Sequence, residues 1–154
     1  MEPETIRALF RALQEENVDY VLVGALAMDV LGIGRMTEDI DLFVRSTPDN
    51  VARLRTALYR VWQDPSIDLI TAEDLAGEYP AIQYVAPDGT PIDIIARLGD
   101  AFAFSDIEAA VHSYGEVEVR VATPQTLYRM KRDTVRLREK ADPQVLKDKF
   151  HLKE

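Results

Sequence analysis

The stretch that most restricts the fold of this chain is a short apolar run carrying two aspartates, D-I-D-L-F-V at residues 39–44. Its composition is typical of a β-strand, in which side chains two residues apart point to the same face. Asp39 and Asp41 would therefore stand side by side, and adjacent carboxylates repel each other unless a cation lies between them. The pattern predicts a divalent-metal site on a strand.

Length and composition are typical of one soluble globular domain. The 154 residues are 47% hydrophobic and 29% charged, and the absence of cysteine excludes disulfides and thiolate zinc sites. No apolar run approaches the roughly 20 residues of a membrane span, and the acidic N-terminus is unlike a signal peptide. We expect a single domain over residues 1–154, with a core at about 18–122 and C-terminal helices at about 123–154, in the cytoplasm and without a membrane partner.

Charge is unevenly distributed along the chain. The net charge of −9 disfavours non-specific binding of nucleic acid. Residues 129–140, however, carry six basic and two acidic side chains. This run predicts one basic surface, which suits a ligand that carries phosphate.

The order of helical and extended patterns predicts an α+β fold, with a mixed β-sheet and helices packed on it. Expected strands are residues 18–23, 39–44, 81–85, 91–96 and 116–121, the last half-exposed and at a sheet edge. Expected helices are residues 6–13, 25–31, 48–61 and 72–75, a short one around 107–111, and two that begin after Thr123 and Asp142. Between residues 81–85 and 91–96, the sequence Pro87-Asp88-Gly89-Thr90 is a strong hairpin signal.

Asp93 lies between two isoleucines in the expected strand 91–96. If that strand lies beside 39–44, Asp93 converges with Asp39 and Asp41. Carboxylate ligands without Cys or His select Mg²⁺ or Mn²⁺ over zinc. Two such ions on a polyphosphate can activate an attacking hydroxyl and stabilise the leaving pyrophosphate. The alternative is that these aspartates end strands and face water.

Gly24 follows one expected strand and opens the next helix. A glycine there lets the backbone approach a ligand, and a helix N-terminus favours phosphate. The alternative is an ordinary turn. The chain has no P-loop motif, and the glycines at 32 and 34 follow a helix instead of preceding one, so a dinucleotide fingerprint is excluded.

Gly24-Ala25, the D-I-D strand and Asp93 together resemble the pattern of the nucleotidyltransferase superfamily. Residues 21–44 are similar to the bacterial AbiEii-type nucleotidyltransferases, which often show R-x-T-x-D-I-D. The positions that match this string are Arg35, Thr37, Asp39 and Asp41. The positions that match the basic residues and the Lys/Arg-Asp pair on late helices of these relatives are Lys131, Arg138, Lys140 and Asp142.

The resemblance implies a minimal nucleotidyltransferase (polymerase-beta-like) fold whose C-terminal helices close a cleft. It also implies transfer of a nucleoside monophosphate from an NTP to a hydroxyl of RNA or protein, with two Mg²⁺ or Mn²⁺ ions. Such an enzyme can be the toxin of a toxin–antitoxin pair, partnered by an antitoxin protein. The expected catalytic and metal-binding residues are Asp39, Asp41 and Asp93, and the expected nucleotide-binding residues are Gly24, Ala25, Arg35, Thr37, Lys131 and Arg138.

One position departs from the superfamily pattern. Ala25 stands where Gly or Ser is preferred, and its side chain cannot hydrogen-bond a phosphate, although its backbone can. A degenerate module that binds nucleotide or a partner protein without turnover therefore remains the alternative, and a structural domain with surface aspartates is a third reading. Lys131 and Arg138 fall at the edge of the apolar face of their helix, where aliphatic stems alone can also explain them.

Overall fold

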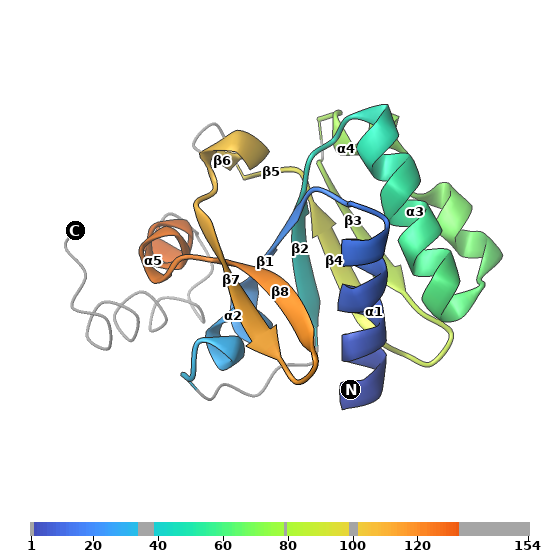
Figure 1. Cartoon of the computed structure of the whole chain (residues 1–154). Coiled ribbons are helices and arrows are strands. Elements are labelled where there is room, and N and C mark those ends of the chain that lie inside the picture. The colour runs from blue at the N-terminus through green and yellow to red at the C-terminus, as the bar shows by residue number, and fades with distance from the viewer. Residues whose placement is uncertain (1, 34–38, 79, 99–101, 133–154) are drawn as a thin grey trace.

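The computed structural model describes residues 2–33, 39–78, 80–98 and 102–132, in which helices flank a central sheet (Figure 1). The helices are α1 (Pro3–Glu15), α2 (Gly24–Val30), α3 (Pro48–Trp62), α4 (Ala72–Leu75) and α5 (Pro124–Arg132), with 3₁₀ turns η1 (Pro65–Leu69) and η2 (Phe104–Asp106). The strands are β1 (Tyr20–Val23), β2 (Ile40–Val44), β3 (Ala81–Val85), β4 (Pro91–Ile95), β5 (Arg97–Leu98), β6 (Phe102–Ala103), β7 (Ala109–Tyr114) and β8 (Val117–Ala122). No helix among these residues is long and apolar enough to cross a membrane.

Six of the strands form one sheet in the order β3-β4-β2-β1-β8-β7. Pairs β2–β4 and β1–β8 are parallel and the other neighbours are antiparallel, so the expected mixed sheet is confirmed. The β3–β4 hairpin also forms as expected, and Gly89 adopts the positive φ of 90° that its turn requires. The short strands β5 and β6 pair separately.

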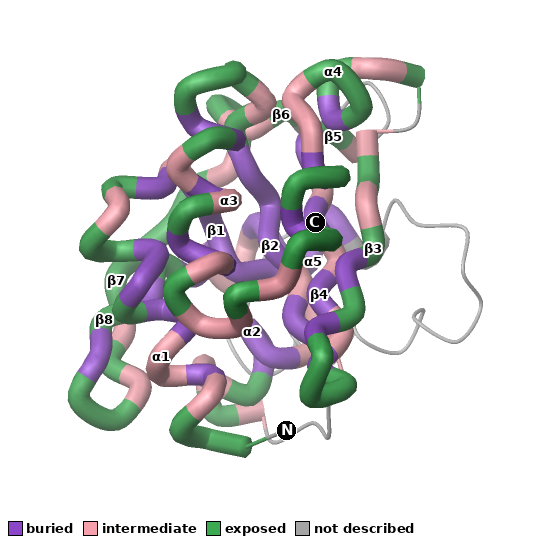
Figure 2. Tube along the Cα trace, turned by 90° about the vertical axis from the view of Figure 1, so that its right-hand side faces the viewer, coloured by how far each residue is buried: buried purple, intermediate pink, exposed green. Residues whose placement is uncertain are grey.

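Helices cover both faces of the sheet. Helices α1 and α3 contact each other on one face, while α2 and α5 lie on the other side (Figure 1). The apolar positions expected on the first helix, Ile6, Leu9, Phe10 and Leu13, are all buried. Strands β1 and β2 are buried along most of their length, whereas β7 is largely exposed (Figure 2). The core therefore lies around the β1–β2 pair.

Two helix starts follow the capping pattern expected from Thr-Pro pairs. The hydroxyl of Thr47 accepts a hydrogen bond from the backbone N–H of Asn50 at 3.4 Å, at the start of α3. The hydroxyl of Thr123 accepts one from the N–H of Thr126 at 3.2 Å, at the start of α5.

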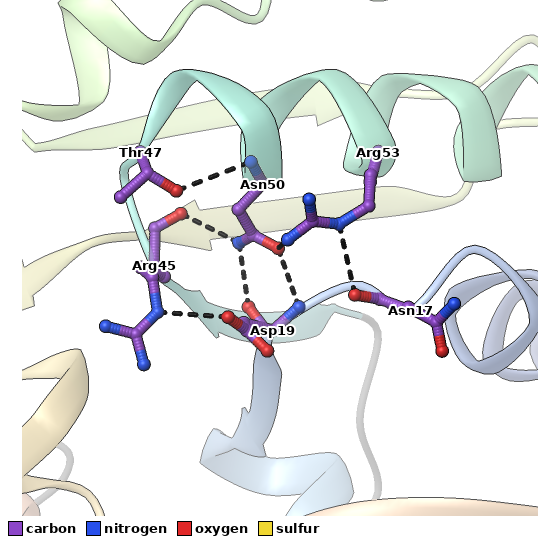
Figure 3. Close-up of polar contacts among 6 residues, drawn as sticks. All are labelled: Asn17, Asp19, Arg45, Thr47, Asn50 and Arg53. Atoms are coloured by element: carbon purple, nitrogen blue, oxygen red, sulfur yellow. Dashed lines mark hydrogen bonds and ion pairs between the residues drawn. The ribbon is translucent and has the colours of Figure 1, made fainter.

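Asn50 fastens α3 to the sheet at the end of the β1–β2 pair (Figure 3). Its side chain is fully buried. Its amide nitrogen donates to the carbonyl oxygens of Asp19 and Arg45 at 3.0 and 2.8 Å, and its amide oxygen accepts from the N–H of Asp19 at 2.7 Å. A buried amide with all these partners costs little to bury and fixes the geometry around it.

Two expectations are wrong, both near the β7–β8 hairpin. The expected helix around 107–111 is strand β7 for most of its length, because Gly115, at φ 60°, turns the chain back so that residues 109–114 pair with β8. The strand expected at an edge, residues 116–121, corresponds to β8, which lies between β1 and β7. The edge is β7 instead.

Candidate active site

Asp41 and Asp93 lie directly opposite each other on neighbouring strands. In the parallel β2–β4 pair, Asp41 is in register with Asp93, so the two side chains share one face of the sheet at a strand spacing of about 4.8 Å. Both are partly buried, whereas Ile40 and Ile92 beside them are fully buried on the opposite face. The structure therefore meets the condition on which the approach of Asp93 to the first acidic strand depends.

Asp39 lies one residue before β2 and is also partly buried. Among the described residues, no group of three or more His, Cys, Asp or Glu side chains is arranged to hold a metal ion. The sheet thus pairs Asp41 with Asp93, and the side chain of Asp39 does not join them in a three-carboxylate cage. In donor chemistry, the pair fits a hard divalent cation, which prefers carboxylate oxygen.

Gly24 makes room for one of these carboxylates. Val23 is in register with Asp41, so the β1–α2 junction sits beside the acidic strand. A Cβ atom on Gly24 would lie 2.8 Å from Cγ of Asp41 and would overlap its carboxylate. The φ of Gly24 is +74°, in the region that side chains rarely adopt. Glycine is therefore required here by two independent constraints.

The first turn of α2 lies at the same place. The N-cap residue, Val23, provides no capping side chain, and Gly24 and Ala25 are partly buried. The next three residues of the helix, 26–28, are buried and anchor the helix in the core. The backbone N–H groups at a helix start carry partial positive charge, which suits an anionic group beside Asp41.

The other expected nucleotide-binding positions are not brought together by the described structure. Arg35, Thr37 and Arg138 lie outside the described residues, as do Lys140 and Asp142. Lys131 falls within α5, of which only the backbone is described at that position. These four nucleotide-binding assignments stay predictions.

One residue near the carboxylates was missed by sequence reasoning. Gln83 on β3 is in register with Asp93 and is exposed. Asp41, Asp93 and Gln83 therefore form a row across three adjacent strands, on one face of the sheet. The hairpin signal at Asp88-Gly89 contained this information, because a tight turn fixes which residues of the two arms face each other.

Comparisons with known proteins agree with this geometry. The family model described as "Nucleotidyl transferase AbiEii toxin, Type IV TA system" matches residues 7–147. The crystal structure of JHP933 from Helicobacter pylori is similar to this chain, with a TM-score of 0.51 and 17% sequence identity. That likeness covers 94% of this chain and 64% of the JHP933 chain, and it shows the fold. A search of curated proteins found no match.

The family match and the structural likeness confirm the expected minimal nucleotidyltransferase fold, with its mixed sheet and flanking helices. The family model extends over nearly the whole chain and includes the acidic strand and Asp93. The chain belongs to the AbiEii family of nucleotidyl transferase toxins, which are components of type IV toxin–antitoxin systems.

Proposed function

We propose that this chain transfers a nucleoside monophosphate from an NTP to a hydroxyl group of an RNA or protein acceptor, as a toxin partnered by an antitoxin protein. The observation that carries the proposal is the register of Asp41 with Asp93, next to a glycine whose missing side chain makes room for Asp41. Family membership supports the reaction class and the toxin–antitoxin setting.

The proposed cofactor is Mg²⁺ or Mn²⁺, as two ions. Asp41 and Asp93 would hold the ions as a pair. Asp39, two residues before Asp41, is assigned to the same ions by the family pattern and not by the described geometry. When bound, such ions neutralise the charge of a triphosphate and favour ionisation of a hydroxyl group. The oxygen-only donor set and the pairing of two carboxylates across parallel strands support this choice.

Other residues of the chain would bind the phosphates and accept the proton of the acceptor hydroxyl. In the first turn of α2, the backbone N–H groups of Gly24 and Ala25 would donate to phosphate oxygens. Asp93, on the far side of Asp41 from α2, would take the proton of the acceptor hydroxyl. Further contacts to the triphosphate are assigned in this proposal to Arg35, Thr37, Lys131 and Arg138.

Bond changes in the reaction balance without a further reactant. The acceptor oxygen bonds to the α-phosphorus of the NTP, and the bond from that phosphorus to the oxygen bridging to the β-phosphate breaks. Pyrophosphate leaves with the electron pair, and the hydroxyl proton passes to the carboxylate of Asp93. Positioning and charge stabilisation supply most of the catalysis in such transfers.

A labelling experiment tests the proposal. The chain is incubated with each α-³²P-labelled NTP, Mg²⁺, total cellular RNA and total cellular protein, and the labelled product is identified by nuclease and protease digestion. We expect the wild type to label one fraction and Asp41→Asn to lose at least 100-fold in rate. Asp29→Asn, an exposed change on α2, serves as the matched control. Undiminished labelling by Asp41→Asn would refute the metal role.

A second candidate is a module that binds nucleotide without turnover. It is favoured by Ala25, which lacks a hydroxyl, and by the absence of a three-carboxylate group among the described side chains. Calorimetry with Mg²⁺ and each NTP, combined with a pyrophosphate assay, separates the two candidates. Binding without pyrophosphate release in the presence of both cellular fractions supports the module.

A further inference from the structure

Gln83 continues the row of site residues beyond Asp93. It is in register with Asp93, which is in register with Asp41, so the three side chains point to the same face of β3, β4 and β2. Two strand spacings separate Gln83 from Asp41, about 10 Å. A molecule bound at the carboxylates that is longer than this spacing would therefore reach Gln83.

The face of β3 that carries Gln83 is open. Ala81, Gln83 and Val85 are all exposed, and Val85 retains 55% of its accessible surface. The intervening Tyr84 points the other way and is buried. Helix α2 contacts β1, β2 and β8, at the opposite side of the row. The row thus runs from a helix-covered end at Gly24 to an exposed end at Gln83.

The difference between the two ends of the row indicates from which side each substrate approaches. This inference rests on the proposed function. In-line displacement places the attacking and leaving oxygens on opposite sides of the phosphorus. If the triphosphate lies at the first turn of α2, the pyrophosphate leaves toward that side. The acceptor hydroxyl then approaches from the β3 side, so that Gln83 lies next to the acceptor.

The chemistry of this surface indicates which part of the acceptor it contacts. The exposed residues of β3 carry no charge, so they suit a neutral group better than a phosphate. A glutamine amide offers one donor and one acceptor side by side, which matches the edge of a nucleobase.

We propose that Gln83 is a positioning residue that hydrogen-bonds the terminal base of an RNA acceptor and so places its terminal hydroxyl beside Asp93. Gln83 does not contact the NTP and takes no part in proton transfer. The role is one of acceptor specificity, at a single-stranded end where the edge of the base is accessible.

The test measures initial rates of labelling against the concentration of cellular RNA, with the NTP held saturating. For Gln83→Ala, we expect the half-saturating RNA concentration to rise about fivefold or more, while kcat at saturating RNA and the KM for the NTP stay within twofold. Gln83→Met keeps the approximate size, stays neutral and loses both hydrogen-bonding groups, and it should show the same split. Gln14→Ala, an exposed change on α1, is the matched control and should leave all three quantities unchanged.

Each other outcome has a distinct meaning. If the wild type labels RNA and neither Gln83 variant changes the half-saturating concentration, the inference is wrong and the proposed function stands. Label that resists nuclease and is removed by protease overturns the base contact, because the acceptor is then protein. If the wild type releases no pyrophosphate with either fraction, the proposed function fails and this role of Gln83 fails with it. Thermal melting of each variant shows that it is folded.

Discussion

Gly24 leaves open the space that the carboxylate of Asp41 occupies. Gly24 lies where β1 passes into α2, and Asp41 lies near the start of β2. Even so, a Cβ atom at position 24 would lie 2.8 Å from Cγ of Asp41. The glycine was expected to bring backbone close to a phosphate. Its direct structural role is to let an acidic side chain stand against the first turn of a helix.

Replacement of Gly24 by alanine should therefore disturb Asp41. We expect Gly24→Ala to reduce labelling at least tenfold. It should also lower the free energy of unfolding, measured in urea, by more than the backbone strain of a positive φ alone would. Gly89→Ala is a matched control, because Gly89 also has a positive φ, of 90°, but nothing lies within 4 Å of its missing Cβ. That variant should show only the strain, about 1 kcal/mol, and unchanged labelling.

Comparing Gly24→Ala with Gly89→Ala separates the effect of the overlap with Asp41 from the effect of the positive φ. If Gly24→Ala and Gly89→Ala lose equal stability and both keep full activity, the space beside Gly24 is irrelevant to the position of Asp41. The pairing of glycine and aspartate would then be a feature of the turn only.

The Asp41–Asp93 pair should lower the thermal stability of the protein without metal and raise it when Mg²⁺ is bound. Like charges directly opposite on adjacent strands are destabilising, by up to about 1 kcal/mol. In metal-free buffer, Asp41→Asn and Asp93→Asn should each melt at or above the temperature of the wild type. Added Mg²⁺ should raise the melting temperature of the wild type and leave both variants unchanged, because ligand binding stabilises only the form that binds.

Differential scanning fluorimetry over a Mg²⁺ series measures both effects. Asp29→Asn, on the exposed side of α2, should follow the wild type throughout. A wild-type melting temperature that is insensitive to Mg²⁺ and Mn²⁺ would count against any metal at the pair, and would favour aspartates that simply face water.

Much of the site could be predicted from sequence because its signals are local. An aspartate within an apolar strand, such as Asp93 between two isoleucines, is unusual enough to indicate chemistry. The adjacency of β2 and β4 was a condition that sequence alone could not test, because strand pairing depends on the whole sheet. The close approach of Asp41 to Gly24 was likewise invisible, since these residues meet only after β1 and β2 pair.

The errors near β7 also have a physical cause. Short runs of alanine and valine, such as residues 109–111, fit a helix and a strand equally, and pairing with β8 decides between them. The alternating charges of β8 suggested an edge strand. In the structure, Glu118 and Arg120 are exposed while Val119 between them is buried, a pattern that an interior strand with one solvent-facing side also shows.

Removal of the buried amide of Asn50 should cost stability without altering the site. Asn50→Ala leaves three backbone hydrogen-bonding groups of Asp19 and Arg45 without this partner, and we expect a loss of about 2–5 kcal/mol in urea unfolding. Thr47→Ala removes one capping bond of the same helix and should cost less, about 1 kcal/mol.

The site should survive both changes below their melting temperatures. Arg45 follows the end of β2, whereas Asp41 lies near its start, so the KM for the NTP of folded Asn50→Ala should equal that of the wild type. A smaller stability loss for Asn50→Ala than for Thr47→Ala would show that the hydrogen bonds from the Asn50 side chain to Asp19 and Arg45, drawn in Figure 3, contribute little.

The hydrogen bond between Tyr84 and Asp64 should make stability depend on pH in the acidic range. The Tyr84 hydroxyl donates to the Asp64 carboxylate at 2.8 Å, and this bond lowers the pKa of Asp64 below its ordinary value. Burial of the ring, with the neighbouring carboxylate, raises the pKa of Tyr84, so its hydroxyl stays protonated as a donor. A carboxyl group whose pKa is lower in the folded state stabilises the fold above its unfolded pKa, near 4, and loses that contribution as the pH falls through the folded value.

Tyr84→Phe keeps the ring packed against Trp62 but removes the donor. Its urea midpoint should therefore lie below that of the wild type at pH 7, and the difference should narrow as the pH falls below about 4. Tyr114→Phe on β7 serves as the control and should show no such convergence, while a constant gap between Tyr84→Phe and the wild type from pH 3 to 7 would rule out the Asp64 contact as its cause.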